Sequence, residues 1–384
     1  MIALALLVAA PAAQAAKPRK APAGPRFYTA PVPLPAGRPG DVIWSRPASA
    51  QASLAAASRN LVVLYRSTDA NGKAIAVSGL VSLPKGKAPK SGWPVVSWSH
   101  GTTGIADACA PSRDSATSPV RAYIEYVHPV LNAWLKRGYA VVRTDFQGLG
   151  TAGLHPYLIG RSEAAGAIDI VRAARRIDSR VGRTWVSAGH SQGGQAALFA
   201  AAEGPSRAPE LRLRGVAAFA PASHILEQVN AAKIFTTPSG LSALGALFVG
   251  GIASGGVIKP ADILGAKAAA LFPQVDTLCL PQLAAADSWG GLAPAEILRD
   301  DADLGPARTV LAAMNPALKI SVPVLMLQGD ADTTVFKSFT DQLLTELKAK
   351  GDAVDYRVAA GVDHAAIVSA EQQATTTWLV QRLR

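Results

Sequence analysis

Charged residues make up only 17% of this 384-residue chain, and cysteine occurs twice. The low charge excludes a coiled coil or a disordered chain, since both are rich in charged residues. No Cys-x-x-Cys or His-Glu-x-x-His spacing occurs, so the sequence supports no metal site. What the chain does have is 49% hydrophobic residues, enough for one large domain or two.

Basic residues outnumber acidic ones by 38 to 27, which gives a net charge of +11. They are scattered singly rather than clustered with aromatic residues, and this argues against a nucleic-acid partner. The densest group is Lys17-Pro18-Arg19-Lys20, close to the N-terminus. We interpret the charge as colloidal, with a contribution to adsorption on anionic surfaces. It leaves the oligomeric state open.

The chain opens with an uncharged apolar run over residues 1–10, and small residues follow, ending in Ala13-Gln14-Ala15. This order is typical of a secretory signal peptide, although the usual positive residues are missing. A membrane anchor is the alternative, but the run is too short to cross a bilayer. We therefore expect a signal peptide over residues 1–16 and a secreted or periplasmic protein. In that compartment Cys109 and Cys279 would most simply form a disulfide.

Strand and helix signals alternate through most of the chain. Residues 17–59 are rich in Pro, Ala and Gly, and we expect an extended arm there, with regular structure starting at Asn60. The turn Asp69-Ala70-Asn71-Gly72 then joins two strands into a hairpin. Further strands alternate with helices expected over 120–136 and 162–177. This order predicts an α/β fold, with a mostly parallel sheet covered by helices on both faces.

The alternation stops after a strand expected over 215–220 and resumes with one over 321–329. The segment between them, 224–318, has a helical pattern, is rich in Gly and Ala, and shows no strand signal. A loop of this length is uncommon in a compact domain. We expect a helical cap inserted into a core made of residues 60–223 and 319–384.

The most informative stretch is Gly189-His190-Ser191-Gln192-Gly193, between an apolar strand and an Ala-rich helix. Gly-x-Ser-x-Gly is typical of a nucleophile elbow, in which the serine occupies a strained strand-to-helix turn. Glycines flank the serine because a Cβ at either place would collide with neighbouring backbone. The turn exposes the Ser191 hydroxyl and points the amide of Gln192 toward a developing oxyanion. The alternative interpretation is a glycine-rich turn of no consequence.

A nucleophilic serine needs a base and an acid, which on this architecture follow it in the order acid, then histidine. Of the six histidines, only His224 and His364 come after Ser191. His224 precedes the cap, so an acid between Ser191 and His224 would have no sheet position. His364 follows a last strand expected over 355–358, and we expect it to be the base.

Two carboxylates compete for the role of the acid, Asp330 and Asp332, which both follow the strand that ends at Gln328. Asp332 has the Gly-x-x-Asp-x-x-Val placement that is usual in such hydrolases, so we prefer it. Asp330 would then cap the turn. Asp363 is adjacent to His364 in the chain and points elsewhere along the backbone, which disfavours it.

The oxyanion site needs a second backbone amide besides that of Gln192. The turn His100-Gly101-Thr102 follows a buried strand over 93–99, where a His-Gly-x motif supplies such an amide. We assign Thr102 to this role. We interpret His100 as a structural group that holds the turn.

Together these motifs resemble the secretory lipases of the fungal lipase A type and their bacterial relatives. The elbow with Asp332 and His364 carries the general likeness, and the long cap with one cysteine narrows it. The narrowing motifs are His100-Gly101-Thr102-Thr103-Gly104, Cys109-Ala110-Pro111-Ser112, Asp145-Phe146-Gln147-Gly148-Leu149-Gly150-Thr151 and His155-Pro156-Tyr157-Leu158.

The resemblance implies an α/β-hydrolase fold with a lid domain and a serine carboxylic-ester hydrolase of the lipase or esterase type. The expected partners are small-molecule or lipid esters, with transient contact at a lipid interface and no cofactor. It also implies a Cys109–Cys279 bridge between core and cap. The fungal members carry an acidic residue at the oxyanion turn, whereas this chain has the His-Gly-Thr-Thr-Gly form of the bacterial relatives.

Other functions remain open on the same fold. An acyltransferase or a peptidase would use the same triad, which defines the acyl-enzyme and not the acceptor. A non-catalytic binding protein usually lacks a triad member, whereas all three residues are present here in order.

The run from Leu241 to Ile258 contains no charge and five glycines. A transmembrane helix is disfavoured, because both ends return to one sheet and glycine at this density weakens a helix. Packing between cap helices is one interpretation. The other is that the run lines an apolar tunnel over Ser191 for an acyl chain, with Gly250 and Gly255 providing width.

Overall fold

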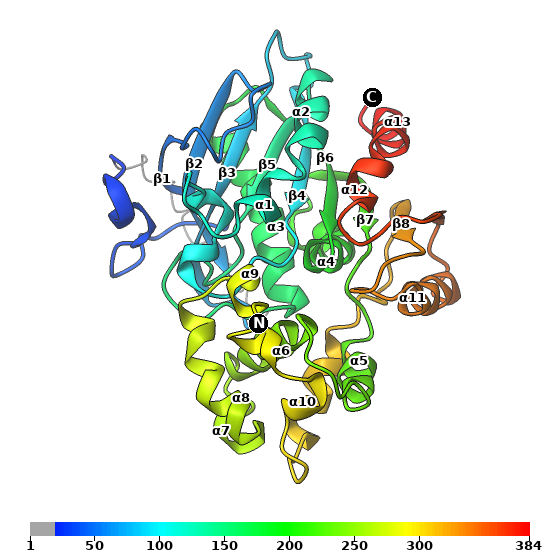
Figure 1. The fold of residues 1–384 in the computed structure, drawn as a ribbon. Helices are drawn as coiled ribbons and strands as arrows, with labels where there is room; N and C mark the ends of the chain where they lie inside the picture. The colour runs from blue at the N-terminus through cyan, green and yellow to red at the C-terminus, as the bar shows by residue number, and fades with distance from the viewer. Residues whose placement is uncertain (1–19) are drawn as a thin grey trace, which may run out of the picture.

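A nine-stranded sheet runs through the molecule in the order β1-β2-β3-β5-β4-β6-β7-β8-β9 (Figure 1). The computed structural model describes residues 20–384, so the expected signal peptide lies outside the described residues. Strands β4 to β9 run parallel to one another, whereas β1, β2 and β3 form an antiparallel edge that joins them at β5. The expected α/β fold with a mostly parallel sheet is confirmed.

The strands are β1 Val42–Pro47, β2 Arg59–Thr68, β3 Ala74–Leu83, β4 Trp93–Ser99, β5 Ala140–Thr144, β6 Val181–His190, β7 Arg212–Phe219, β8 Val324–Gly329 and β9 Val354–Ala359. The helices of the core are α1 Arg121–Glu125, α2 His128–Lys136, α3 Gly160–Ile177, α4 Gln192–Arg207, α11 Lys337–Ala349, α12 Ile367–Ala370 and α13 Gln372–Arg382. Those between β7 and β8 are α5 Ile225–Ala232, α6 Leu241–Ala253, α7 Pro260–Ile263, α8 Ala266–Leu271, α9 Leu280–Leu283 and α10 Gly305–Ala313.

The first strand, β1, lies inside the segment expected to be an extended arm, so the expectation that regular structure starts at Asn60 was wrong. β1 pairs antiparallel with β2 at the edge of the sheet. Ile43 and Trp44 pack against Phe27 in a small apolar cluster beneath it. Pro47 ends the strand, and an edge position tolerates a proline because its missing N–H is not needed by a neighbour.

Helices cover both faces of the sheet because its parallel strands are apolar on both sides. Every residue of β5 and of β8 is buried, with no alternation between faces. On one face lie α3, α4 and α11, and on the other lie α2, α12 and α13. The helix expected over 120–136 is interrupted between α1 and α2.

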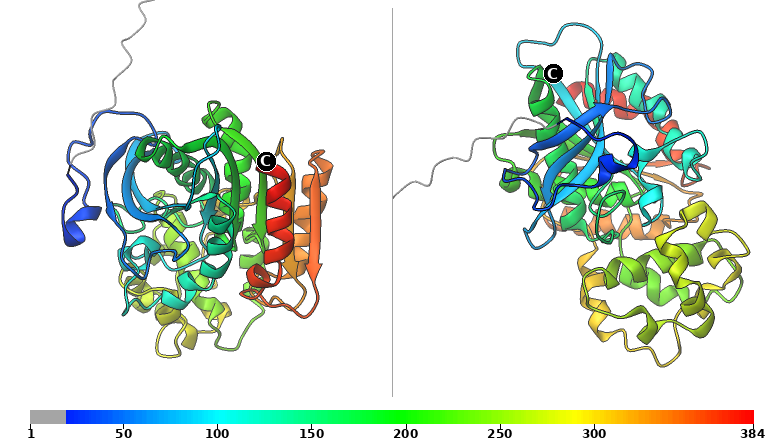
Figure 2. Two further views of the ribbon diagram at one scale, coloured as in Figure 1. Left: turned by 90° about the horizontal axis from the view of Figure 1, so that it is seen from above. Right: turned by 90° about the vertical axis from the view of Figure 1, so that its left-hand side faces the viewer.

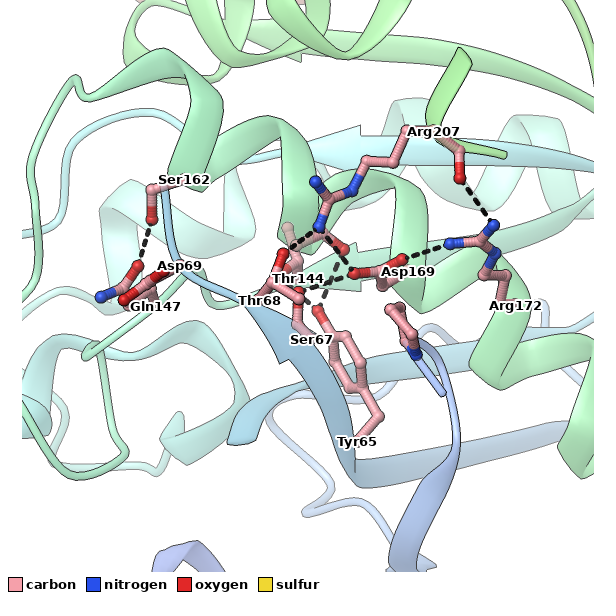
Figure 3. Close-up of polar contacts among 12 residues, drawn as sticks. Tyr65, Ser67, Thr68, Asp69, Thr144, Gln147, Ser162, Asp169, Arg172 and Arg207 are labelled. Atoms are coloured by element: carbon pink, nitrogen blue, oxygen red, sulfur yellow. Dashed lines mark hydrogen bonds and ion pairs between the residues drawn. The ribbon is translucent and has the colours of Figure 1, made fainter. Parts of the chain in front are cut away.

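A buried polar cluster holds α3 against the sheet (Figure 3). Asp169 of α3 accepts a hydrogen bond from Ser67 of β2 at 2.8 Å and pairs with Arg172 at 2.9 Å. Arg207 of α4 approaches the same carboxylate at 3.4 Å. Burial raises the pKa of Asp169, although the two arginines and Ser67 act in the opposite direction. The cluster joins β2, α3 and α4, away from the carboxyl edge of the sheet where the candidate site lies.

The register of the sheet brings several loops together at the carboxyl ends of its strands. Ser99 at the end of β4 pairs with Gly189 of β6, and Gly329 of β8 pairs with Ala359 of β9. In an open parallel sheet this edge is where ligands bind. The loops that carry Thr102, Ser191, Asp332 and His364 therefore all start from one edge.

The segment expected as the cap, residues 224–318, contains α5 to α10 and packs around its own apolar cluster, which includes Leu247, Leu283 and Trp289. It forms a lobe at one end of the sheet, in green to orange in Figure 1 and in the right-hand view of Figure 2. Among residues 20–384 no helix is long and apolar enough to cross a membrane.

Both ends of the cap contact one residue of the core. His224 Nε2, at the first end, lies 3.4 Å from Glu346 Oε2 of α11. Asn315 Nδ2, near the second end, donates to the same oxygen at 2.9 Å. Gln195 of α4 also donates to the carbonyl of Met314 at 2.8 Å. The chain therefore leaves and re-enters the core at one place.

The middle of the cap is attached to the core by the Cys109–Cys279 disulfide, which confirms the expected bridge. The Cα atoms of the two cysteines are 5.5 Å apart, and both residues are buried. Next to the bridge, the amide of Leu280 donates to the carbonyl of Thr103 at 2.9 Å. The bridge thus joins the cap to the turn that follows β4.

Candidate active site

Ser191 occupies the turn between β6 and α4 with φ of 57° and ψ of −120°. This is a strained conformation for a residue with a side chain. A Cβ added at Gly189 would lie 2.1 Å from the carbonyl oxygen of Gly193, and one at Gly193 would lie 2.0 Å from that of Ser99. Both positions therefore require glycine, as the elbow pattern predicts. The Ser191 amide donates to the carbonyl of Phe219 at 2.9 Å, which fixes the turn on β7.

Asp332 and His364 lie together at the neighbouring loops. His364 Nδ1 is 2.7 Å from Asp332 Oδ2. The other oxygen of Asp332 accepts from the amides of Thr334 and Val335, each at 2.8 Å. Burial alone would raise the pKa of Asp332, but these hydrogen bonds and that of His364 outweigh it and lower the pKa. The carboxylate is thus held ionised beside the imidazole.

The side chain of Gln328, at the end of β8, supports Asp332 from behind. Its Nε2 donates to Asp332 Oδ2 at 3.0 Å, and its Oε1 accepts from Thr340 at 2.8 Å. The motif search did not single out Gln328. Its only sequence signal was a polar residue at the end of an otherwise apolar strand.

The two other candidate carboxylates have structural partners. Asp330 is exposed and accepts from the amide of Gly361 at 2.6 Å. Asp363 accepts from the amide of Ala366 at 2.8 Å. The hydrogen bond to His364 is therefore made by Asp332, while Asp330 and Asp363 bond to backbone amides of the loop between β9 and α12.

His190, which precedes Ser191 in the elbow, contacts the loop of His364. Its Nε2 lies 2.8 Å from the carbonyl of His364, and its Nδ1 lies 2.7 Å from the hydroxyl of Tyr126. Since a carbonyl only accepts, His190 carries its proton on Nε2 and accepts at Nδ1 from Tyr126. Burial lowers the pKa of His190, so the ring is neutral. Sequence reasoning did not assign His190 a role.

The turn after β4 packs directly against the serine. A Cβ at Gly101 would lie 3.7 Å from Ser191 Cβ, and Thr102 comes next in the chain. The Thr102 hydroxyl lies 2.7 Å from the hydroxyl of Tyr157. His100 Nδ1 donates to the carbonyl of Gly101 at 2.7 Å, and burial lowers the pKa of His100 to about 4. Neutral His100 thus holds this turn, as expected.

Ser191 and His364 open into one cavity of about 830 Å³ beneath the cap. Thr102, Tyr126, Tyr157 and Phe248 are among the residues that line it. Within residues 20–384 no hydrogen bond joins the Ser191 hydroxyl to His364, although both side chains face this space. The same residues contain no group of three or more His, Cys, Asp or Glu that could hold a metal ion.

A second, more apolar cavity of about 510 Å³ continues from the first into the cap. Leu241, Leu244 and Phe248 of α6 line both cavities, and Gly245 and Ile252 line the second. These positions follow helical spacing and form one face of α6. The expectation that part of the apolar run lines a space over Ser191 therefore fits α6.

The assignment of Gly250 and Gly255 to that lining was wrong. Gly250 lies nine residues after Leu241, which on a helix is about 180° around the axis. It faces the core, where an added Cβ would lie 2.5 Å from Ile105 Cδ1. Gly255 lies beyond the end of α6 and is exposed. Neither glycine lines either cavity.

Behind the serine, the side chain of Gln192 is held by two residues that sequence reasoning missed. Its Nε2 donates to Glu163 Oε1 at 2.7 Å and to His155 Nε2 at 3.1 Å. All three side chains are buried. His155 belongs to a motif that carried the family resemblance, whereas Glu163 had no signal beyond an acidic residue in the first turn of a helix.

A mostly parallel sheet with a serine at a strand-to-helix elbow and a histidine–aspartate pair at the same edge defines an α/β-hydrolase. Comparison with protein families indicates which family within this class the chain resembles. A family model described as secretory lipase matches residues 115–256, which include Ser191 and end before Asp332. The resemblance to the secretory lipase family is confirmed.

One curated relative and several solved structures are similar to this chain. Lipase A of Moesziomyces aphidis is 29% identical over 246 residues, which are 62% of this chain and 51% of the relative. The chain thus spans about half the length of that relative. Candida antarctica lipase A in its closed state superposes with a TM-score of 0.77 at 20% identity, covering 93% of this chain and 85% of that one. The rice cell wall degrading esterase LipA from Xanthomonas oryzae superposes with a TM-score of 0.71 at 19% identity, covering 91% of this chain and 100% of that one.

Proposed function

We propose that the protein is an exported serine hydrolase that cleaves carboxylic esters through an acyl-enzyme. The observation that carries the proposal is the sharing of one cavity by Ser191, in its strained elbow, and His364, hydrogen-bonded to buried Asp332. The relatives named lipase and esterase support the same chemistry. The substrate class is a small-molecule or lipid ester.

In the first half of the reaction, His364 takes the proton of the Ser191 hydroxyl while the oxygen attacks the ester carbonyl. Its Nδ1–H donates to Asp332, which leaves Nε2 free as the base and stabilises the imidazolium that forms. The backbone amides of Thr102 and Gln192 hold the oxyanion of the tetrahedral intermediate. Return of the proton from His364 to the alkoxy oxygen then releases the alcohol and leaves the acyl group on Ser191.

In the second half, water enters the cavity and loses a proton to His364 as it attacks the acyl-enzyme. A second tetrahedral intermediate forms at the same two amides. It collapses when Ser191 leaves with a proton from His364, and the carboxylic acid is released. His190 supports both halves through its bond to the carbonyl of His364, which fixes the loop that carries the base.

The acyl chain of the ester lies in the apolar cavity that continues into the cap. Leu244 and Phe248 line both this space and the cavity of Ser191, so they lie where the two cavities meet. Apolar surface at this place favours an acyl chain over a charged group, because a charge would lose its hydration there.

Export is proposed from the signal-peptide pattern of residues 1–16, which precede the described part of the chain. The Cys109–Cys279 disulfide supports it, because disulfides persist in oxidising compartments. N-terminal sequencing of the mature protein tests the cleavage, which is expected after Ala15 or Ala16. An unprocessed N-terminus in exported protein would contradict it.

The enzymatic proposal is tested by labelling with a fluorophosphonate and by turnover of p-nitrophenyl esters. The adduct should map to Ser191, and Ser191→Ala should lower kcat by about 10⁴-fold or more while the protein stays folded. An adduct on another serine, or unchanged turnover by Ser191→Ala, would contradict the assignment.

A further inference from the structure

A network of hydrogen bonds behind Ser191 includes Gln192, the residue proposed to stabilise the oxyanion. Gln192 donates both N–H groups of its side-chain amide, one to Glu163 of α3 and one to His155. His155 Nδ1 in turn donates to the carbonyl of Gln147 at 2.8 Å. The side chain of Gln147 accepts from Ser162 at 2.5 Å, as Figure 3 shows, and Ser162 is the neighbour of Glu163 on α3.

The hydrogen-bond partners in this network indicate how His155 and Glu163 are protonated. Burial lowers the pKa of His155 to about 3, so the ring is neutral and its Nε2 accepts. Glu163 Oε1 accepts from Gln192 and from the amide of Leu158 at 3.0 Å. No partner is present for Glu163 Oε2 among residues 20–384. The side-chain amide of Gln192 is thus held between two acceptors, Glu163 and His155.

We propose that Glu163 is a positioning residue for the oxyanion site, acting through the side chain of Gln192, and that it does so in its uncharged form. The inference rests on the proposed function. Gln192 is the first residue of α4, and its backbone amide is the proposed oxyanion donor. Fixing its side chain from α3 fixes that amide, and an oxyanion donor acts only within a few tenths of an ångström of its required place.

The uncharged form is favoured by the surroundings of Glu163. The titratable groups that face it are His155 from the preceding loop and Tyr157, and α4 contributes the amide of Gln192. No Arg or Lys pairs with Glu163 in the described part of the chain. Burial therefore raises the pKa of Glu163 to about 8, although the hydrogen bonds from Gln192 and Leu158 act in the opposite direction.

Ionisation of Glu163 would place a negative charge against the side chain of Gln192, the residue whose backbone amide must stabilise another negative charge. Like charges in a buried site repel strongly, so the transition state would be raised in energy. We therefore expect kcat to fall as the pH rises through about 8, where Glu163 loses its proton. Neutral His155 gives no compensating charge.

The test compares kcat and KM for p-nitrophenyl acetate between about pH 6 and about pH 10 in five proteins: wild type, Glu163→Ala, Glu163→Gln, Gln192→Met and Asp169→Asn. Asp169 is the matched control, because it is a buried carboxyl on the same helix with partners away from the site. Its variant should keep the wild-type pH profile, whatever it does to the melting temperature.

We expect Glu163→Ala to lower kcat by about 10- to 100-fold with KM within about twofold, since the oxyanion bond strengthens in the transition state. Glu163→Gln imitates the uncharged carboxyl, so it should restore kcat to within about threefold of wild type and remove the alkaline decline. Gln192→Met removes a bond that lowers the pKa of Glu163, so the decline should move to higher pH.

The inference is overturned if wild type shows no alkaline decline, or if Glu163→Gln retains it. It is also overturned if Glu163→Ala loses no more kcat than Asp169→Asn. Should Glu163→Ala fail to fold, the profile of Glu163→Gln decides alone, because that change keeps the shape of the side chain. Failure of the proposed function looks different, since wild type would then neither turn over the ester nor react with a fluorophosphonate at Ser191.

Discussion

Replacing Asp332 by asparagine exchanges one carboxylate oxygen for an NH₂ group, although the hydrogen-bond partners of this carboxylate in the described structure are all donors. Thr334 and Val335 donate backbone N–H groups to one oxygen, while Gln328 and His364 donate to the other. Asparagine accepts with one oxygen only. If this oxygen stays on the two backbone amides, its NH₂ group faces His364, which must then accept at Nδ1 and carry its proton on Nε2.

That tautomer cannot take the proton of Ser191, so the base is lost without loss of the fold. We expect Asp332→Asn to lower kcat by about 10⁴-fold, as wrong-tautomer substitutions do in serine hydrolases with a Ser-His-Asp triad. This equals about 5.4 kcal/mol of transition-state stabilisation. KM should change little, because the cavity that binds the ester is untouched.

The assay is steady-state hydrolysis of p-nitrophenyl butyrate near neutral pH, with Asp330→Asn as the matched control. Asp330 lies two residues away and is exposed, and among the described residues its side chain bonds only to the amide of Gly361. Its variant should retain kcat within about threefold and lose some stability. The opposite ranking of the two variants would refute the reasoning and would make Asp330 the acid.

Two further predictions concern the cap. The bridge closes a loop of 170 positions, so replacing Cys109 and Cys279 by alanine should lower the free energy of unfolding by up to about 5 kcal/mol, measured by urea denaturation. An unchanged midpoint would contradict this. Leu244→Trp should lower turnover of palmitate esters by about tenfold relative to acetate, because the larger ring narrows the passage between the cavities. Exposed Leu154→Trp is the control, and equal losses on both esters would contradict the acyl site.

The elbow was predictable because local sterics dictate it, and the alternation of strands and helices was predictable from the residue pattern. Gly189 and Gly193 stand where any Cβ would meet backbone oxygen, so their spacing around Ser191 is visible in the sequence. Chain order then limited the base to His364, and the fold brings it to Asp332. These residues are determined by short-range rules and by topology.

The face of α6 could not be predicted, because a helix without a charged residue has no polar side to mark solvent. Packing decides its orientation. An added Cβ at Gly251 would lie 2.5 Å from the carbonyl of Tyr157, so that side of the helix lies against the core. Leu244 and Phe248 are left to face the cavities. Composition drew attention to the glycines, but the packing of α6 on the core decides which residues face the cavities.

Glu163 was missed for a different reason. An acidic residue in the first turn of a helix ordinarily favours the helix dipole from a solvated position, and it carries no further information. Here the side chain is buried against Gln192, a contact between residues 29 positions apart in the chain. No spacing rule connects them, because the register of α3 and α4 comes from the whole sheet.

The contacts of both cap ends with Glu346 bring the start and the end of this lobe to one place on the core. His224 and Asn315 meet the same carboxylate, so the two ends of the insert lie together on the core. The entropy of closing such an insert grows only slowly with its length. Growth, loss or exchange of the lobe can therefore alter which molecules reach Ser191, while the strands that carry the serine keep their places.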